Sequence, residues 1–238
     1  YMLTFGKSIG SEYSKYISGK VIDIGNIRNN KFHISKDENK IKNSILFISQ
    51  WVNNSDSLNY KVNKIVTHLI DQFAYKNNLS LGILLRAKSD GVESEKIFFR
   101  NNIKNQFHFI NKDKHKNSYF WIDKYELITT IDSTLGYESL ARGNKTVFIT
   151  IRDEIGKMGG NSGYNFGWPK NYEDKGVCWT NKNQKETIFK LLSNMFHIDK
   201  KSWKEAIIKN NFDDLIIYDK NNNKALKFFK TEITKNIN

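Results

Sequence analysis

Short apolar runs alternate regularly with segments of helical periodicity, and this alternation restricts the fold more than any other feature of the sequence. Residues 62–75 carry apolar side chains three and four positions apart, which predicts an amphipathic helix. Strands that alternate with helices are typical of a parallel sheet covered on both faces. We therefore predict an α/β fold, with a Rossmann-like parallel sheet and helices on both faces, over residues 44–205. The runs that predict buried strands are residues 44–51, 79–87, 126–131 and 145–151.

The regions on either side of this domain predict smaller pieces of structure. Residues 3–6 and 20–25 are predicted to form short strands, with a helix over 8–17 between them. Residues 27–42 are polar and irregular, which predicts an interdomain linker, and 224–235 predict a terminal amphipathic helix. The chain is thus expected to divide into the end of a preceding domain with a linker (1–43), the Rossmann-like domain (44–205) and a helical tail (206–238).

The charge balance favours anionic partners. The chain has 38 Lys and Arg against 25 Asp and Glu, a net charge of +13. Nucleic acid, anionic lipid headgroups and phosphate-bearing small molecules would all suit such a charge. An equally good explanation is a composition rich in Lys, Asn and Ile, as AT-rich genomes encode. The basic residues form no consecutive block, which argues against a nucleic-acid partner.

The sequence also favours a cytoplasmic location. Cys178 is the single cysteine, which suits a reducing compartment. No apolar run approaches the roughly 20 residues that a membrane-spanning helix needs. The first residues lack a basic region followed by a long apolar one, so they do not predict a signal peptide.

The most informative segment is DSTLGYESLARG, in which a predicted strand leads into a helix. Ser133 and Thr134 open that helix, where free backbone N–H groups and the helix dipole favour a phosphate. Gly136 allows close approach, and Glu138 follows one turn later, where it can accept hydrogen bonds from a ribose diol. The alternative is an ordinary capped helix in which Glu138 pairs with Arg142 on the surface.

Several motifs resemble bacterial surface-carbohydrate and O-antigen glycosyltransferases of the GT-B fold. The longest is DSTLGYESLARGNKTVF, which resembles the donor-site segment of that family. The earlier strings FGKSIGSEYSKYI and IGNIRNN resemble its interdomain junction, and NFGWP followed by GVCW resembles a later loop. The motifs occur in the expected order and together extend over most of the chain.

This resemblance implies a domain arrangement and a set of site residues. Residues 44–205 would be the C-terminal, nucleotide-sugar-binding domain, preceded by the end of the N-terminal domain and followed by a tail that crosses back to it. By the same resemblance, Ser133, Thr134 and Gly136 would hold the donor phosphates, and Glu138 would contact the ribose. Epimerases of sugar nucleotides and other transferases use comparable segments.

A second candidate site follows the predicted strand 79–87. Arg86 and Lys88 point to the same side of an extended chain and can neutralise a diphosphate or a sugar carboxylate. The alternative is a pair of solvated cations at the start of a loop. The resemblance also places a basic segment here. Many acid-sugar transferases carry a His-Pro pair near this point, which this chain lacks, so the donor sugar stays open.

Two loops are further candidates. The Gly-rich segment 156–169 is long, and Asn161, Tyr164 and Trp168 could close over a sugar; a surface loop is the alternative. The turn Ser49–Asn53 could hold phosphate through backbone amides or could be an ordinary loop. No site for a metal or cofactor is predicted, because the five histidines lack ligand spacing and a D-x-D triplet is absent.

These observations predict the donor-binding half of a metal-independent glycosyltransferase. It would transfer a sugar from a nucleotide-sugar to a surface polysaccharide or lipid-linked acceptor, with the general base in the N-terminal domain. Its basic surface would allow peripheral contact with the inner membrane face. Two alternatives stay open: a sugar-nucleotide epimerase on the same fold, and a basic nucleic-acid-binding module.

Overall fold

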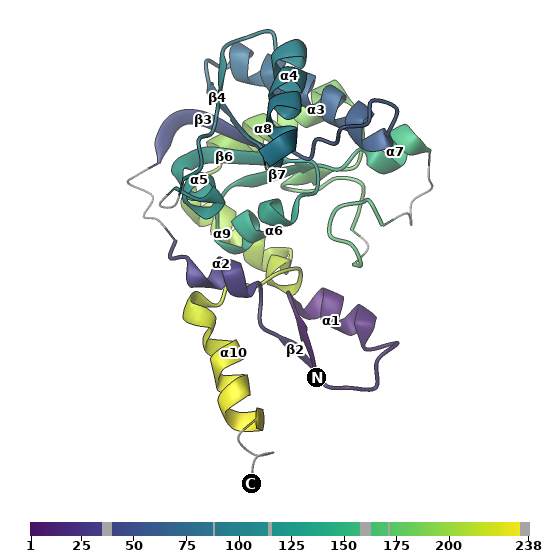
Figure 1. Cartoon of the computed structure of the whole chain (residues 1–238), viewed down its shortest axis with the longest axis vertical. Coiled ribbons are helices and arrows are strands. Elements are labelled where there is room, and N and C mark those ends of the chain that lie inside the picture. Colours follow the sequence, from purple (N-terminus) through teal and green to yellow (C-terminus); the bar gives the residue numbers. More distant parts are fainter. Residues whose placement is uncertain (35–39, 88, 114–115, 158–162, 171, 234–238) are drawn as a thin grey trace.

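A parallel sheet of six strands forms the centre of the molecule (Figure 1). The structure, a computed structural model, describes residues 1–34, 40–87, 89–113, 116–157, 163–170 and 172–233. The strand order is β5-β4-β3-β6-β7-β8, with every neighbouring pair parallel. The chain leaves β3 toward one edge and later returns to build the other edge from β6, which is the doubly wound Rossmann order. The strands are β3 (Ile41–Ile48), β4 (Ser80–Leu84), β5 (Phe107–Phe109), β6 (Tyr125–Thr130), β7 (Thr146–Ile149) and β8 (Trp179–Thr180).

Helices cover both faces of this sheet, which confirms the predicted fold class. The helices are α3 (Leu58–Lys76), α4 (Val92–Asn102), α5 (Ser118–Lys124), α6 (Thr134–Ala141), α7 (Arg152–Gly156), α8 (Lys185–His197) and α9 (Lys200–Lys209). Ser57 starts the longest of them, since its side chain accepts a hydrogen bond from the Tyr60 amide at 3.2 Å.

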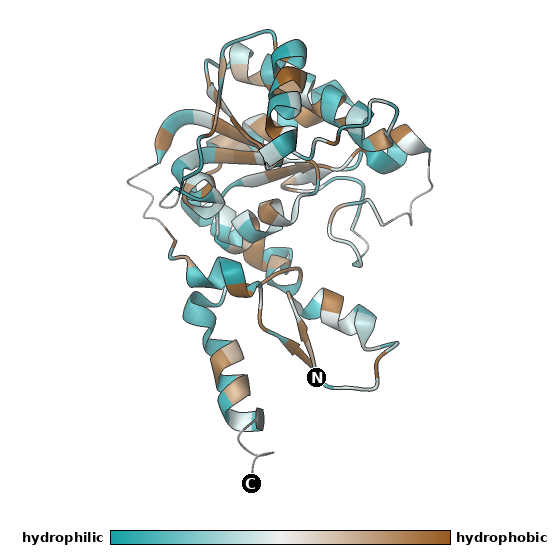
Figure 2. Cartoon of the chain, in the orientation of Figure 1, coloured by the Kyte–Doolittle hydropathy of each residue, from teal (hydrophilic) through white to brown (hydrophobic). Residues whose placement is uncertain are grey.

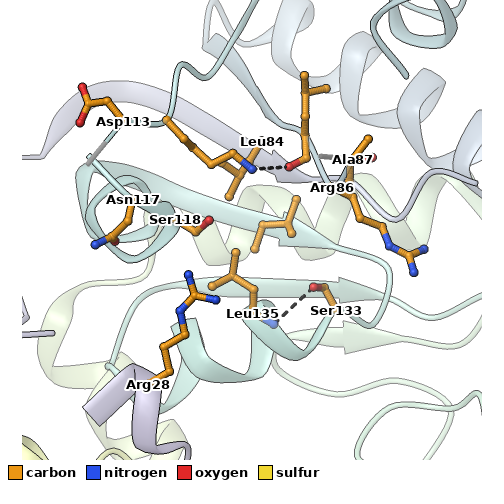
Figure 3. A pocket seen from close by; sticks show the side chains of 13 residues that line it. Arg28, Leu84, Arg86, Ala87, Asp113, Asn117, Ser118, Ser133 and Leu135 are labelled. Atoms are coloured by element: carbon orange, nitrogen blue, oxygen red, sulfur yellow. Dashed lines mark hydrogen bonds between the residues drawn. The ribbon is translucent and has the colours of Figure 1, made fainter. Parts of the chain in front are cut away.

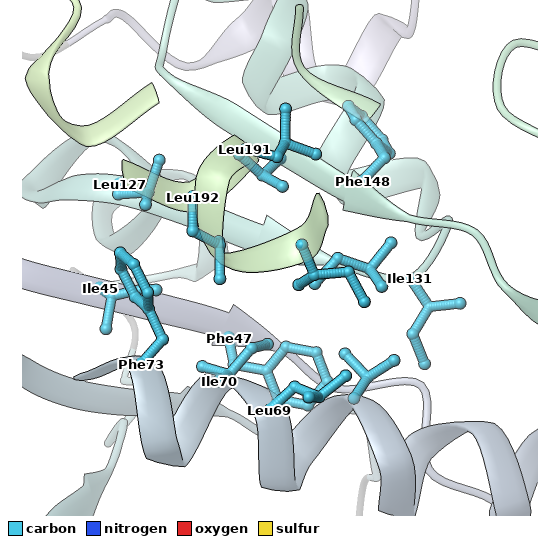
Figure 4. Close-up of a cluster of buried hydrophobic side chains, with 14 of the residues drawn as sticks. Ile45, Phe47, Leu69, Ile70, Phe73, Leu127, Ile131, Phe148, Leu191 and Leu192 are labelled. Atoms are coloured by element: carbon cyan, nitrogen blue, oxygen red, sulfur yellow. The ribbon is translucent and has the colours of Figure 1, made fainter. Parts of the chain in front are cut away.

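The two cores follow from the alternation of side chains along the strands. Ile45 and Phe47 of β3 face a large core that also takes in α3, α4 and α8 (Figure 4). Leu46 and Ile48 face a smaller core formed with α5. Hydrophobic residues are accordingly concentrated along the strands, while polar residues dominate the outer faces of the helices (Figure 2).

We call the six-stranded sheet with the helices on its two faces the sheet domain. A small lobe lies below α6 and α9 of this domain in the view of Figure 1. We use this name for a parallel pair of strands, β1 (Met2–Thr4) and β2 (Val21–Asp23), with α1 (Lys7–Tyr13) and the C-terminal helix α10 (Asn223–Phe228). A π-helical turn, Phe229–Ile233, continues α10. Tyr1 joins the two ends of the chain, because its ring lies 5.0 Å from that of Phe228.

The segment 27–42, which the sequence predicts to be irregular, contains helix α2 (Ile27–Lys31). The prediction of an irregular segment was wrong. Helix α2 could not be recognised because it has no apolar stripe. Its order comes from asparagines that are buried against other parts of the chain, Asn29 and Asn30. The expected division at 43/44 falls inside β3 and that at 205/206 inside α9, and the division into domains stays a prediction. No helix in the described ranges is long and apolar enough to cross a bilayer.

Candidate functional site

A pocket of about 510 Å³ lies at the carboxyl ends of β3, β4 and β6. The ends of two strands contribute Ile48 and Ser49, at the end of β3, and the segment 84–87, at the end of β4. The remaining lining comes from the segment after β5, the start of α5, the start of α6 and one residue of α2. In doubly wound sheets, ligands bind in the crevice where the strand order reverses, here between β3 and β6. The pocket therefore occupies the position that the topology favours for a ligand.

The charged side chains that line the pocket are mostly cations. Arg28, Arg86 and Lys112 are positive, and Asp113 is the acidic residue among the described lining residues. Arg28 points up from α2, Arg86 lies on the opposite side, and the carboxylate of Asp113 points away from both (Figure 3). The Lys112 ammonium donates a hydrogen bond of 2.8 Å to the Leu85 carbonyl. The electrostatics of the pocket favour an anionic ligand.

The structure brings Ser133 and Arg86 together as lining residues of this one pocket. Ser133 caps α6, since its hydroxyl accepts from the Leu135 amide at 3.3 Å, while its own amide donates to the Thr130 hydroxyl at 3.2 Å. Thr134 is exposed and does not belong to the lining. The opening of α6 thus faces the pocket through Ser133, and the phosphate-binding role of both hydroxyls stays a prediction.

Gly136 lies one turn further, against the sheet. A Cβ atom at this position would come within 2.5 Å of the Thr130 methyl group and 3.2 Å of the Phe148 ring. Close packing of α6 on β6 and β7 therefore explains why this position is a glycine. Contact between Gly136 and a donor phosphate stays a prediction.

Glu138 is buried beside the pocket and does not line it. Its carboxylate accepts a hydrogen bond from the Asn26 side chain. Burial raises the pKa of Glu138 to about 7, although the hydrogen bond from Tyr119 and the charge of Arg28 act in the opposite direction. Its expected contact with a ribose stays a prediction.

The alternative of a surface ion pair between Glu138 and Arg142 is wrong. Arg142 is buried and pairs with Asp123 through its Nε and Nη2 atoms. Its remaining N–H groups donate to the Asn29 side chain and to the carbonyls of Phe32 and His33, at 2.9–3.0 Å. One guanidinium thereby fixes α2 and the residues after it to the sheet domain.

A buried carboxylate of α4, that of Glu95, organises the end of β4. Glu95 has no exposed surface and accepts hydrogen bonds from the amides of Arg86 (3.0 Å) and Ala87 (2.7 Å). The hydroxyl of Ser49, at the end of β3, donates to the same carboxylate. Ser49 is thus engaged with Glu95. Among the described residues, the exposed Arg86 side chain has one hydrogen-bond partner, the Trp51 carbonyl, at 3.4 Å. Lys88 lies outside the described residues.

The Gly-rich loop presents two aromatic rings outside the pocket lining. Trp168 is 53% exposed, and the ring of Tyr164 lies 5.5 Å from the guanidinium carbon of Arg152. Phe166 anchors the loop, because it is buried and stacks on Trp179 at 4.6 Å between ring centroids. Asn161 lies outside the described residues, and the role of the loop in sugar binding stays a prediction.

Arg152 is a further residue that the sequence analysis missed. It pairs with both carboxylate oxygens of Asp132, the residue before Ser133, and donates to the Gln50 side chain at 3.3 Å. Gln50 in turn accepts from the Asp132 amide at 2.8 Å. The network connects the ends of β3, β6 and β7 and fixes the turn into α6. No sequence signal joins Arg152 to Asp132, since Arg152 begins α7 and Asp132 lies 20 residues earlier, between β6 and α6.

Within the described ranges, no three His, Cys, Asp or Glu side chains are grouped closely enough to hold a metal ion. Cys178 is fully buried, as expected for a core residue, and burial raises the pKa of its thiol. The pocket itself presents cations, hydroxyls and the start of a helix.

Comparisons with known proteins agree with this geometry. A family model described as "putative O-antigen biosynthesis protein" matches residues 1–233. No curated protein matches the sequence. The fold is similar to that of the wall teichoic acid polymerase TagF, with a TM-score of 0.58 and 14% identity for a variant soaked with CDPG. A second TagF structure gives a TM-score of 0.58 and 16% identity. These matches cover 100% of this chain but 59% and 58% of the TagF chain, and at such identities they show the fold alone.

Proposed function

The chain belongs to the O-antigen biosynthesis protein family, and from this premise we propose that it is the donor-binding part of a GT-B glycosyltransferase. The pocket at the carboxyl ends of β3, β4 and β6 would bind the phosphates of a nucleotide-sugar. One observation carries this proposal: cations from three separate segments, Arg28, Arg86 and Lys112, line a pocket at the point where the strand order reverses.

Such a pocket suits the chemistry of glycosyl transfer. When the glycosidic bond of a nucleotide-sugar breaks, negative charge develops on the leaving phosphate. Preorganised cations and hydrogen-bond donors stabilise that charge. We assign this task to Arg86 and the turn at Ser133, with Thr134 at its exposed start. This arrangement supplies positive charge from the protein itself, so we propose transfer without a metal ion.

The acceptor and the general base belong to another part of the enzyme in this proposal. GT-B enzymes, which the sequence motifs resemble, work in a cleft between two domains. TagF, which has a similar fold, is longer than this chain. We propose a glycan or lipid-linked acceptor that reaches the pocket from the side of the small lobe. The net charge of +13 supports peripheral contact with an anionic inner membrane face, and hence a cytoplasmic location.

The test is a thermal-shift screen against UDP-, GDP-, dTDP-, CDP- and CMP-linked sugars, with CDPG included because TagF was soaked with it. Stabilisation grows with the ratio of ligand concentration to Kd, so the correct nucleotide should raise the Tm most. If none of these donors shifts the Tm, the proposal is rejected. Incubation of the protein with the best donor and no acceptor distinguishes a transferase from the epimerase alternative, because an epimerase would release an isomerised sugar.

A further inference from the structure

Among the described residues that line the pocket, Arg28 comes from outside the sheet domain. It belongs to α2, which precedes β3, yet its side chain lines the pocket together with Ser133 and Leu135 of α6. Figure 3 shows its guanidinium rising from α2 toward the space between Ser118 and Ser133. A bound ligand in this space would therefore contact two parts of the molecule at once.

The position of Arg28 is fixed by its neighbour Asn26. The side-chain oxygen of Asn26 accepts from the Arg28 amide at 2.9 Å and so caps α2. The side-chain nitrogen of the same residue donates to Glu138 on α6. Asn30, two residues after Arg28, is 1% exposed; it donates to the Ile24 carbonyl and accepts from the Asp219 amide, both at 2.9 Å. The backbone on both sides of Arg28 is thus held by buried polar contacts.

The Arg28 guanidinium can offer its N–H groups and its charge to a ligand. Across the described parts of the chain, the Arg28 side chain makes no hydrogen bond or ion pair, and it is exposed. Glu138 acts on it electrostatically. Because burial raises the pKa of Glu138 to about 7, that carboxyl group is only partly ionised near neutral pH. The positive charge of Arg28 is therefore incompletely neutralised inside the protein.

We infer that Arg28 is a phosphate-binding residue of the pocket, so that a bound nucleotide diphosphate bridges α2 and the start of α6. This inference rests on the proposed function, which it extends to a residue outside the sheet domain. An arginine suits the role because its planar fork can bind two phosphate oxygens at once. The consequence is that donor binding and the docking of α2 on the sheet domain stabilise each other.

Isothermal titration calorimetry of the full chain with UDP, CDP, GDP and dTDP tests the inference. We expect Arg28→Gln to weaken the tightest of these diphosphates at least about tenfold, which corresponds to about 1.4 kcal/mol. Arg28→Lys should recover part of the loss, because it keeps the charge without the fork. Lys31→Gln is the matched control: it removes a positive charge from the same helix at a residue that does not line the pocket.

A second measurement separates binding from a merely structural role. In hydrogen exchange, the diphosphate should protect the amides of α2 and of α6 in the wild-type chain, but only those of α6 in Arg28→Gln. If the wild-type chain binds a diphosphate and Arg28→Gln binds it equally well, the inference is overturned while the proposed function stands. If the wild-type chain binds none of the four, the inference is rejected. The proposed function is rejected only if the thermal-shift screen, which includes CMP-linked sugars, is negative as well.

Discussion

The two edges of the sheet carry pockets of opposite character. The pocket at the amino edge is the larger, about 840 Å³ against about 510 Å³, and it is also lined by lysines and an arginine. Several of its basic groups are nevertheless engaged: Lys40 donates to the Asp123 and Tyr125 carbonyls at 3.3 and 3.0 Å, and Lys145 donates to the Phe196 carbonyl at 2.8 Å. At the carboxyl edge, among the described residues, the Arg28 side chain makes no hydrogen bond and the Arg86 side chain makes one, to the Trp51 carbonyl.

This difference teaches that volume and the number of cations do not define a binding site. Lys40, Arg142 and Lys145 at the amino edge hold segments of the chain together through hydrogen bonds that are already made. The cations of the carboxyl edge are exposed and project into a pocket at the switch point. We therefore expect substitutions at the amino edge to change stability and those at the carboxyl edge to change binding.

The largest effect is expected at Arg142, which lines the amino-edge pocket. Arg142→Met should lower the free energy of unfolding by about 3–5 kcal/mol, because it removes the guanidinium that balances the charge of the buried Asp123 carboxylate. Urea unfolding followed by circular dichroism measures this loss. The double variant Arg142→Met with Asp123→Leu removes both charges and should recover part of the stability. A loss below about 1 kcal/mol for the single variant would show that the pair contributes little.

Glu138 lies between the two edges, midway along α6, and its ionisation should oppose folding. Its pKa is raised from 4.5 to about 7, so the folded chain binds the proton more tightly than the unfolded chain. The contribution of this group therefore makes the free energy of unfolding fall as pH rises from about 4.5 to about 7. Glu138→Gln should remove this contribution, roughly 1–3 kcal/mol across the window. Parallel stability profiles for variant and wild type would contradict the assignment.

At the carboxyl edge, Arg86→Ala should weaken binding of the best donor about tenfold, or about 1.4 kcal/mol, with little change in Tm without ligand. Lys204→Ala is the matched control, since this exposed lysine lines the amino-edge pocket. Calorimetry with the donor from the thermal-shift screen measures both. Equal losses in the two variants would indicate a general charge effect and would end the distinction between the edges.

The smallest effect concerns metal ions. If fixed cations of the carboxyl edge supply the charge that the donor phosphates need, EDTA should leave the donor-induced thermal shift unchanged. A shift that disappears with EDTA and returns with Mg²⁺ or Mn²⁺ would show that the cations alone are insufficient.

Much of the fold could be predicted because the relevant signals are local. The strands carry continuous apolar runs, and helices such as α3 carry a stripe with the correct period. Their bounds agree with the structure to within a few residues. Helix α2 could not be found in this way, since its order depends on Arg142 and Asp219, which lie far along the chain.

The same contrast between local signals and long-range contacts separates the site residues that could be predicted from those that could not. Ser133 and Arg86 could be identified because each follows a predicted strand, and the ends of neighbouring parallel strands meet at one edge. Arg28 could not, because nothing in the sequence places α2 above that edge. Glu95 could not be identified either, because its role depends on backbone amides eight and nine residues earlier. The sequence of a helix does not show which backbone N–H groups a carboxylate in it will bind.

Asn26 uses both ends of one short side chain, and this narrows the choice of amino acid at its position. Aspartate and serine start helices about as well as asparagine. An ionised aspartate has no donor for Glu138 and would set two carboxylates against each other, while serine has a single oxygen for two partners on different helices. Among the common capping residues, asparagine alone offers a separate acceptor and donor here. A position that looks replaceable by the rules for helix starts is therefore constrained by its second contact.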